Sequence, residues 1–158
     1  MSSSSSPTEV DARVAALCRH YESVYREKMQ GLPFVNPALA IEAVGFRPAG
    51  EHVLGVLIAP WFINLVLLPG NDKLAALAPG ESFGLLLGGE TIEFTATAEA
   101  ATGPFLTAVL FRSVEDFDDQ STARAVSLEV MRLLREGEAG SGQKAGGMSR
   151  RDLFRAAG

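Results

Sequence analysis

Two charged segments toward the C-terminal end of the chain have the residue types and spacing for specific pairing chemistry. The first contains, in order, Ser149, Arg150, Arg151, Leu153, Phe154 and Arg155. Paired arginines after a serine, with large apolar residues beyond them, form the core of a twin-arginine export signal. Such a signal acts at an N-terminus, ahead of an apolar stretch of about 7–15 residues. We therefore expect this copy to be bound as a peptide rather than to direct export. The alternative is an accidental basic tail.

The second segment places four carboxylates within a short stretch. They belong to Glu115, Asp116, Asp118 and Asp119. Acids just before a helix are favoured by its dipole, and one of them, or Ser121, can cap the helix. That accounts for one or two of the four, and the rest repel one another unless cations relieve them. Because arginine binds a carboxylate through two charge-assisted hydrogen bonds, the segment is also a candidate site for paired arginines.

Catalytic and metal-binding chemistry has little support in this sequence. The two histidines, His20 and His52, have no acid, nucleophile or metal-ligand partner at a useful spacing. The one cysteine, Cys18, excludes an internal disulfide and any site built from several cysteines. We predict a non-enzymatic protein that has no catalytic residues and binds no metal or cofactor.

Length and composition restrict the class of protein further. The chain has 158 residues, enough for one domain, and 47% of them are hydrophobic while 21% are charged. A net charge of −5 without a basic stripe argues against a nucleic-acid partner. No apolar run approaches the ~20 residues of a membrane-spanning helix, and the serine-rich start is no export signal. We expect a cytoplasmic protein without stable membrane insertion.

The elements that must position the charged segments are two helices with strands between them. Apolar residues recur at helical spacing from Val10 to Met29, and a second helix is predicted over 121–135, with Ala125, Leu128 and Met131 facing inward. Strands are predicted at 41–46, 53–59, 62–68, 82–87, 90–97 and 107–111. This order predicts an α+β domain: an antiparallel sheet of five or six strands flanked by an N-terminal and a C-terminal helix.

The domain organisation follows from composition. Residues 1–7 are predicted to be a disordered leader and 8–136 the folded α+β domain. Residues 137–147, rich in glycine, are predicted to be a flexible linker, and 148–158 the twin-arginine-like tail.

The predicted sheet has more apolar surface than two helices on one side can cover. Strands 53–59 and 62–68 are apolar on both faces, whereas a sheet with one wet face should alternate. We expect both helices on the same face, so the other face needs a cover. The candidates are the loop 31–40, a second copy in a homodimer, or a foreign partner; the alternative is the chain's own loops and C-terminal helix. Trp61, Phe62 and Asn64 are the residues we expect on this binding surface.

Several stretches of the sequence carry a family resemblance. They are 25–33, 36–39, 42–46, 54–70 and 117–123. The most specific is Pro60-Trp61-Phe62, followed after one residue by Asn64-Leu65. Over about residues 15–135 the chain resembles the HybE family of [NiFe]-hydrogenase assembly chaperones.

The resemblance implies a cytoplasmic maturation factor that binds the hydrogenase small-subunit precursor, including its twin-arginine signal peptide, until assembly and cofactor loading are complete. Some relatives carry a rubredoxin domain, whose iron site a chain with a single cysteine cannot form. The resemblance assigns no binding residues.

Three hypotheses follow. In the first, Trp61, Phe62 and Asn64 hold the apolar part of the client signal, the acidic segment pairs with its arginines, and the tail is an internal mimic that masks the site. In the second, the protein joins the large and small hydrogenase subunits without reading the signal peptide. In the third, an apolar cavity under the sheet carries a small molecule.

Overall fold

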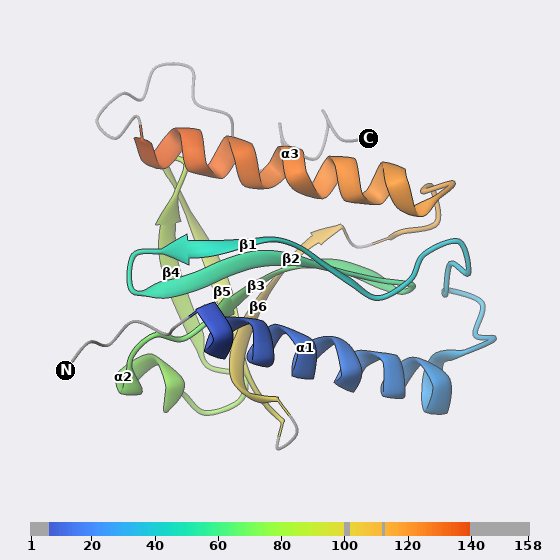
Figure 1. Cartoon of the computed structure of the whole chain (residues 1–158), viewed down its shortest axis with the longest axis horizontal. Helices are drawn as coiled ribbons and strands as arrows, with labels where there is room; N and C mark the ends of the chain where they lie inside the picture. Colours follow the sequence, from blue (N-terminus) through green and yellow to red (C-terminus); the bar gives the residue numbers. More distant parts are fainter. Residues whose placement is uncertain (1–6, 100–101, 112, 140–158) are drawn as a thin grey trace.

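Six strands form one antiparallel sheet in the order β1-β2-β3-β6-β5-β4. The computed structural model describes residues 7–99, 102–111 and 113–139. Its strands are β1 Glu42–Ala49, β2 His52–Ala59, β3 Phe62–Leu68, β4 Ser82–Leu87, β5 Glu90–Glu99 and β6 Gly103–Phe111. Its helices are α1 Pro7–Val24, the π-helical turn η1 Tyr25–Met29, α2 Asp72–Ala75 and α3 Gln120–Ala139. The predicted α+β class and the flanking helices are confirmed (Figure 1).

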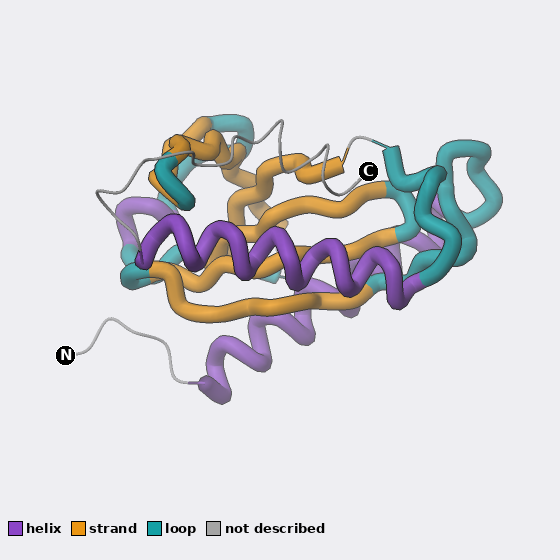
Figure 2. Tube along the Cα trace, turned by 90° about the horizontal axis from the view of Figure 1, so that it is seen from above, coloured by secondary structure: helices purple, strands orange, loops and turns teal. Residues whose placement is uncertain are grey.

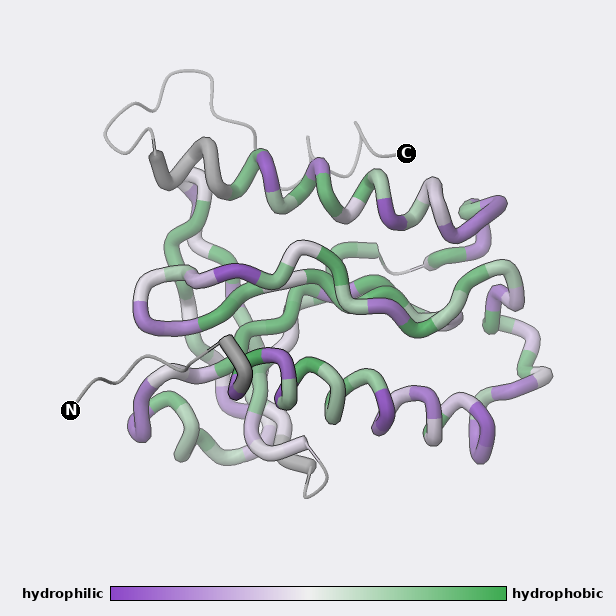
Figure 3. Tube along the Cα trace, in the orientation of Figure 1, coloured by the Kyte–Doolittle hydropathy of each residue, from purple (hydrophilic) through white to green (hydrophobic). Residues whose placement is uncertain are grey.

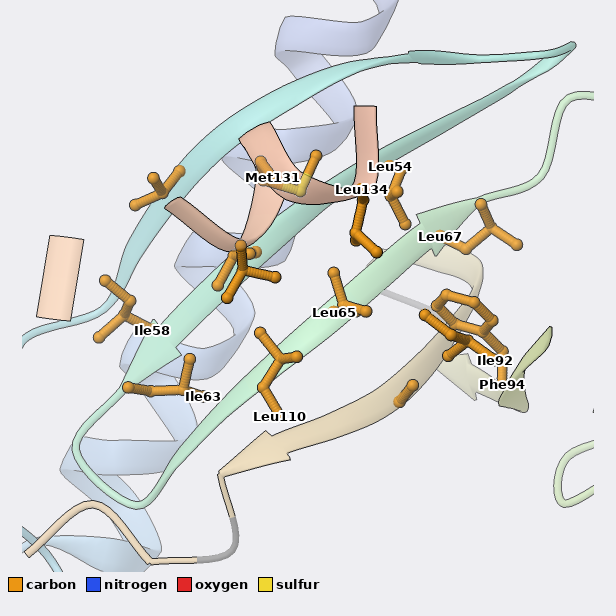
Figure 4. Close-up of a cluster of buried hydrophobic side chains, with 14 of the residues drawn as sticks. Leu54, Ile58, Ile63, Leu65, Leu67, Ile92, Phe94, Leu110, Met131 and Leu134 are labelled. Atoms are coloured by element: carbon orange, nitrogen blue, oxygen red, sulfur yellow. The ribbon is translucent and has the colours of Figure 1, made fainter. Parts of the chain in front are cut away.

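The prediction that both helices lie on one face is wrong. Figures 1 and 2 show α1 and α3 on opposite sides of the sheet. The cluster under α3 contains Met131 and Leu134 of the helix with Leu65 of β3, as Figure 4 shows. A separate cluster joins Leu17 of α1 to Leu57 of β2. The sheet is therefore the middle layer of three.

This layering explains why the central strands are apolar on both faces. In β2, Leu54, Val56 and Ile58 belong to the α3 side, while Leu57 between them belongs to the α1 side. All four are fully buried. Successive side chains of a strand point to opposite faces, so a strand covered on both faces needs no polar alternation. Figure 3 shows these strands as largely apolar, with most of their length in green.

The expected uncovered apolar face of the central strands is therefore absent from the structure. Val66 and Leu68 of β3 lie under α1 and are buried, so the chain's own helices cover both sides of these strands. The sheet opens to solvent farther out, where Thr91, Glu93 and Thr95 of β5 are exposed. They alternate with the buried Ile92, Phe94 and Ala96, as expected of a strand with one face in solvent.

The inward face of α3 was predicted correctly at Met131 and wrongly at Ala125 and Leu128. Ala123, Val130 and Met131 are buried, whereas Ala125 and Leu128 are exposed. The fully buried Ser127 satisfies its hydroxyl by donating to the carbonyl of Ala123 at 2.8 Å.

The structure extends α3 to Ala139, into the stretch predicted as linker. Residues 1–6 and 140–158, which hold most of the leader, most of the linker and the whole tail, lie outside the described residues. Among the helices described, none combines the length and apolar character needed to cross a membrane.

Candidate functional site

The β2–β3 turn, which carries Trp61, and the acidic segment, residues 115–119, lie at the same end of the molecule. Figures 1 and 2 show the loop 30–41 and the start of α3 at this end as well. Asn36 connects them. Its backbone N–H donates to the carbonyl of Pro60 at 2.7 Å. Its side-chain amide donates to the carbonyls of Val114 and Phe117, each at 2.8 Å. One residue thus fixes the turn beside Trp61 against the acidic segment.

A second set of contacts fastens the same loop to α3. The Gln120 side chain exchanges hydrogen bonds with the backbone of Ala40 and donates to a carboxylate oxygen of Glu42. Arg124 donates to both oxygens of that carboxylate, at 2.7 and 3.0 Å. The hydrogen bond from Arg124 is the main reason the pKa of Glu42 lies below its usual range.

The four predicted acids are all exposed, but they do not play one role. Asp119 caps α3: its carboxylate accepts from the backbone N–H of Thr122 at 2.8 Å, and this contact lowers the pKa of Asp119. Glu115, Asp116 and Asp118 lie before the helix. The cap accounts for one acid, as the dipole argument expects, and leaves three carboxylates on the surface.

Two exposed apolar side chains in the same loop were not singled out from the sequence. Phe34 is 51% exposed and Leu32 is 38% exposed, two and four positions before Asn36. Backbone turns from Leu32 to Met29 and from Val35 to Leu32 hold this stretch in place. The sequence feature that could have indicated a surface loop here is the Asn36-Pro37 pair, because this dipeptide favours a tight turn.

Trp61 and Phe62 are packed against α1 and η1 rather than standing open. The Trp61 ring stacks on Tyr25 with centroids 6.1 Å apart and planes 9° apart. It also meets the Phe62 ring edge-on at 5.4 Å, and Phe62 meets Tyr21 at 5.2 Å. Both residues remain partly exposed. The aromatic cluster therefore supports the end of the molecule and offers only part of its surface to a partner.

Asn64 lies in β3, paired with Leu57 of β2 and Val109 of β6. Its side-chain oxygen is buried and finds no hydrogen-bond partner among the described residues. Buried side-chain amide oxygens usually accept a hydrogen bond, so this atom is an exception within the described part of the chain.

Two hollows lie at the other end of β2, around the β1–β2 turn. One, of about 290 Å³, is bordered by α1 and the β2 end and includes Arg13 and Phe46. The other, of about 390 Å³, separates the turn from β4. His52 and Glu51 line both. The Nδ1 atom of His52 accepts a hydrogen bond from the backbone N–H of Gly70 at 2.8 Å, which requires that nitrogen to be unprotonated.

The free energy of unfolding should decrease as the pH is lowered, because of this histidine. Burial lowers the pKa of His52 from its ordinary value of 6.5, against a smaller opposing effect of the Glu51 carboxylate. Because the pKa is lower in the folded state, the stabilisation that neutral His52 gives the fold is fully present above pH 6.5. It is lost as the pH falls through the lower, folded-state pKa. Chemical denaturation between pH 7 and pH 5 should show this loss in the native chain and a smaller one in His52→Gln. Equal slopes in the two proteins would contradict it.

Comparison with known proteins gives a consistent result. The family model described as [NiFe]-hydrogenase assembly, chaperone, HybE matches residues 12–156. A hydrogenase expression/formation protein HoxT of Azotobacter vinelandii is 41% identical over 90% of this chain and 94% of its own length. The "Probable rubredoxin HupJ" of Rhodobacter capsulatus is 37% identical over 78% of this chain, which spans only 46% of that relative.

A solved structure has the same fold. The solution structure of HybE from Escherichia coli matches with a TM-score of 0.64 and 22% identity, over 85% of each chain. At this identity the likeness establishes the architecture of helices and sheet.

Proposed function

This chain belongs to the [NiFe]-hydrogenase assembly chaperone HybE family, and we propose that it binds the hydrogenase small-subunit precursor with its twin-arginine signal peptide and delays export until assembly is complete. The proposal places this work in the cytoplasm, where an export precursor is made. It requires binding and release rather than catalysis.

The observation that carries the proposal is the junction at Asn36. Its hydrogen bonds to Pro60, Val114 and Phe117 bring the acidic segment next to the loop that exposes Leu32 and Phe34. A twin-arginine signal has the complementary order, two arginines and then an apolar stretch. Carboxylates beside apolar side chains match that order in charge and in polarity.

The proposed binding surface consists of Glu115, Asp116, Asp118, Leu32 and Phe34, with the exposed parts of Trp61 and Phe62 at its border. It differs from the sequence hypothesis in two respects. The sheet face bearing Asn64 is covered beside it by α1, and Asn64 is half-buried with its side-chain oxygen enclosed, so we leave it out of the proposed surface. Asp119 is already engaged as the helix cap, with two hydrogen bonds accepted by its Oδ1, so we leave it out of the proposed surface.

Neutralising the three acids that do not cap the helix should weaken signal-peptide binding. In the variant Glu115→Gln/Asp116→Asn/Asp118→Asn, the Kd for the cognate small-subunit signal peptide should rise roughly five- to thirtyfold, because exposed ion pairs are individually weak and their effects add. Titration of labelled protein would measure it. A twin-lysine peptide should bind native protein more weakly, since lysine lacks the two-pronged contact.

A matched control is Glu129→Gln, which removes one exposed carboxylate from the outer face of α3, away from the acidic segment. It should leave the Kd unchanged at constant salt. If the triple variant binds as tightly as the native chain, these acids do not read the arginines and the proposed site is wrong.

The scaffold hypothesis is favoured by a different observation. Both faces of the central strands are covered by α1 and α3, which removes the broad apolar surface expected to hold the signal's apolar stretch. A scaffold joining large and small subunits would use the folded surface as it stands. Pull-down with a small subunit lacking its signal peptide separates the two: retained, undiminished binding supports the scaffold, and lost binding supports signal recognition.

A further inference from the structure

The two edges of the sheet approach each other at one end without meeting. There the β1–β2 turn faces β4 across the hollow of about 390 Å³, which we call the seam. Its lining comprises Ala49, Gly50, Glu51, His52, Leu85, Leu86 and Leu87. The rings of His52 and Phe83 lie 6.3 Å apart, so the two edges are close but not hydrogen-bonded as neighbouring strands. The seam is a gap in an incompletely closed sheet, with leucines of β4 on one side and the polar side chains of Glu51 and His52 on the other.

The β4 side of the seam is equipped to accept an extended segment. β4 is the last strand of the sheet and pairs only with β5 among the described strands, so its outer edge offers backbone donors and acceptors. Leu86 is 67% exposed, more than any other large apolar side chain described. An added strand would satisfy the edge and cover this leucine, the arrangement known as β-strand addition.

The chain itself supplies a candidate close by. α3 passes over the β4–β5 turn, with Leu134 packed beside Gly88, and ends at Ala139 (Figure 1). The next apolar pair along the chain is Leu153-Phe154. A glycine-rich segment of the intervening length has an end-to-end distance of roughly 20 Å as a random coil. The family model matches the chain through residue 156, so this segment is part of the family pattern.

We propose that the C-terminal segment of this chain docks in the seam, with Leu153 and Phe154 in the hollow and the backbone beside β4. Glu51, the carboxylate in the lining, provides an acidic partner for the adjacent arginines. This inference is independent of the proposed function, since it concerns the chain's contact with itself.

The geometry favours the seam over the acidic segment as the tail's position. α3 has 20 residues, about 30 Å at 1.5 Å per residue, and separates its C-terminal end from the acids before its first turn. Reaching them requires the intervening segment to stretch well beyond its average length, which lowers the effective concentration of the tail there. The seam lies within that average length.

Hydrogen exchange in the full chain tests the proposal. The amides of residues 83–87 should exchange about three- to tenfold faster in Leu153→Ser/Phe154→Ser than in the native chain, since a tethered segment at millimolar effective concentration protects the edge it covers. Leu86→Ser, which alters an exposed side chain, should have the same effect. The control Ala156→Ser/Ala157→Ser changes the same segment without removing the apolar pair and should match the native chain.

Two results would overturn the proposal. Unchanged β4 exchange in both Leu86→Ser and Leu153→Ser/Phe154→Ser means that the segment does not dock there. Protection that grows with protein concentration means that a second copy, not the chain's own segment, occupies the seam.

Discussion

Replacing Asn36 with alanine should lower the free energy of unfolding by about 2–4 kcal/mol and weaken signal-peptide binding roughly tenfold. The side chain makes three hydrogen bonds: two donated to Val114 and Phe117, and one accepted from the backbone N–H of Ala38 at 2.9 Å. Each contributes about 0.5–1.5 kcal/mol, and its removal leaves partly buried carbonyls unsatisfied. Chemical denaturation and peptide titration would measure the two effects.

Asn71→Ala is the matched control. Asn71 also uses its side chain locally, capping α2 by accepting from Leu74 and donating to Glu51. Its loss should cost about 1 kcal/mol, the usual value of a helix cap, and leave peptide affinity unchanged, because it lies at the other end of β2. If Asn36→Ala is destabilised but binds the peptide as well as native protein does, the junction supports the fold and not the binding surface.

The second large effect is expected at Gly70. A Cβ atom placed there would lie 1.6 Å from the carbonyl oxygen of Glu51, a backbone atom that cannot swing aside. The same glycine donates its N–H to His52. Gly70→Ala must therefore move the β1–β2 turn or break that bond, and should cost at least about 3 kcal/mol of stability. Thermal and chemical unfolding of the purified variant would show it.

The variant Gly89→Ala serves as a control that distinguishes a steric clash of the new Cβ atom from the cost of a left-handed backbone conformation. Gly89 has φ of +80°, which disfavours alanine, but nothing lies within 4 Å of a Cβ placed there. Its cost should be about 1–2 kcal/mol, the penalty of left-handed backbone alone. Gly70→Ala should be clearly worse. Equal costs would mean that the β1–β2 turn moves freely and that the packing at Gly70 is loose.

Local patterns predicted most of the elements. The strands β3 and β4 have the bounds expected from the sequence, and β5 begins at Glu90 as predicted. These features depend on neighbours within a few residues. Turn residues such as the Gly88-Gly89 pair, both at positive φ, mark the same boundaries.

Local sequence patterns could not predict on which face of the sheet each helix packs. A strand that is apolar on both faces, such as β2, is compatible with two helices on opposite faces or with one covered face and one open face. The choice depends on how β1 and the loop 30–41 route the chain across the sheet edge, which no spacing of apolar residues encodes. For this reason the sequence analysis expected one uncovered apolar face on a sheet whose central strands are covered on both sides.

The sequence pointed to parts of the proposed binding surface but not to their arrangement. The acids and the Trp61 turn are far apart in sequence, and their proximity is produced by Asn36, whose hydrogen bonds to Val114 and Phe117 span about 80 positions. Sequence spacing carries no information on such a long-range contact. The acids themselves stay a proposal, and the tail stays outside the described residues.

The strand order has a consequence for how the protein is made. β1, β2 and β3 form an antiparallel meander and β4 and β5 a hairpin, and β6, the last of the described strands, joins the two by pairing with β3 and β5. Until the ribosome has released the chain through Phe111, two half-sheets expose unpaired edges side by side. Non-local pairing of this kind folds slowly and invites intermolecular mispairing. The nascent chain is therefore exposed to mispairing until β6 has joined the two half-sheets.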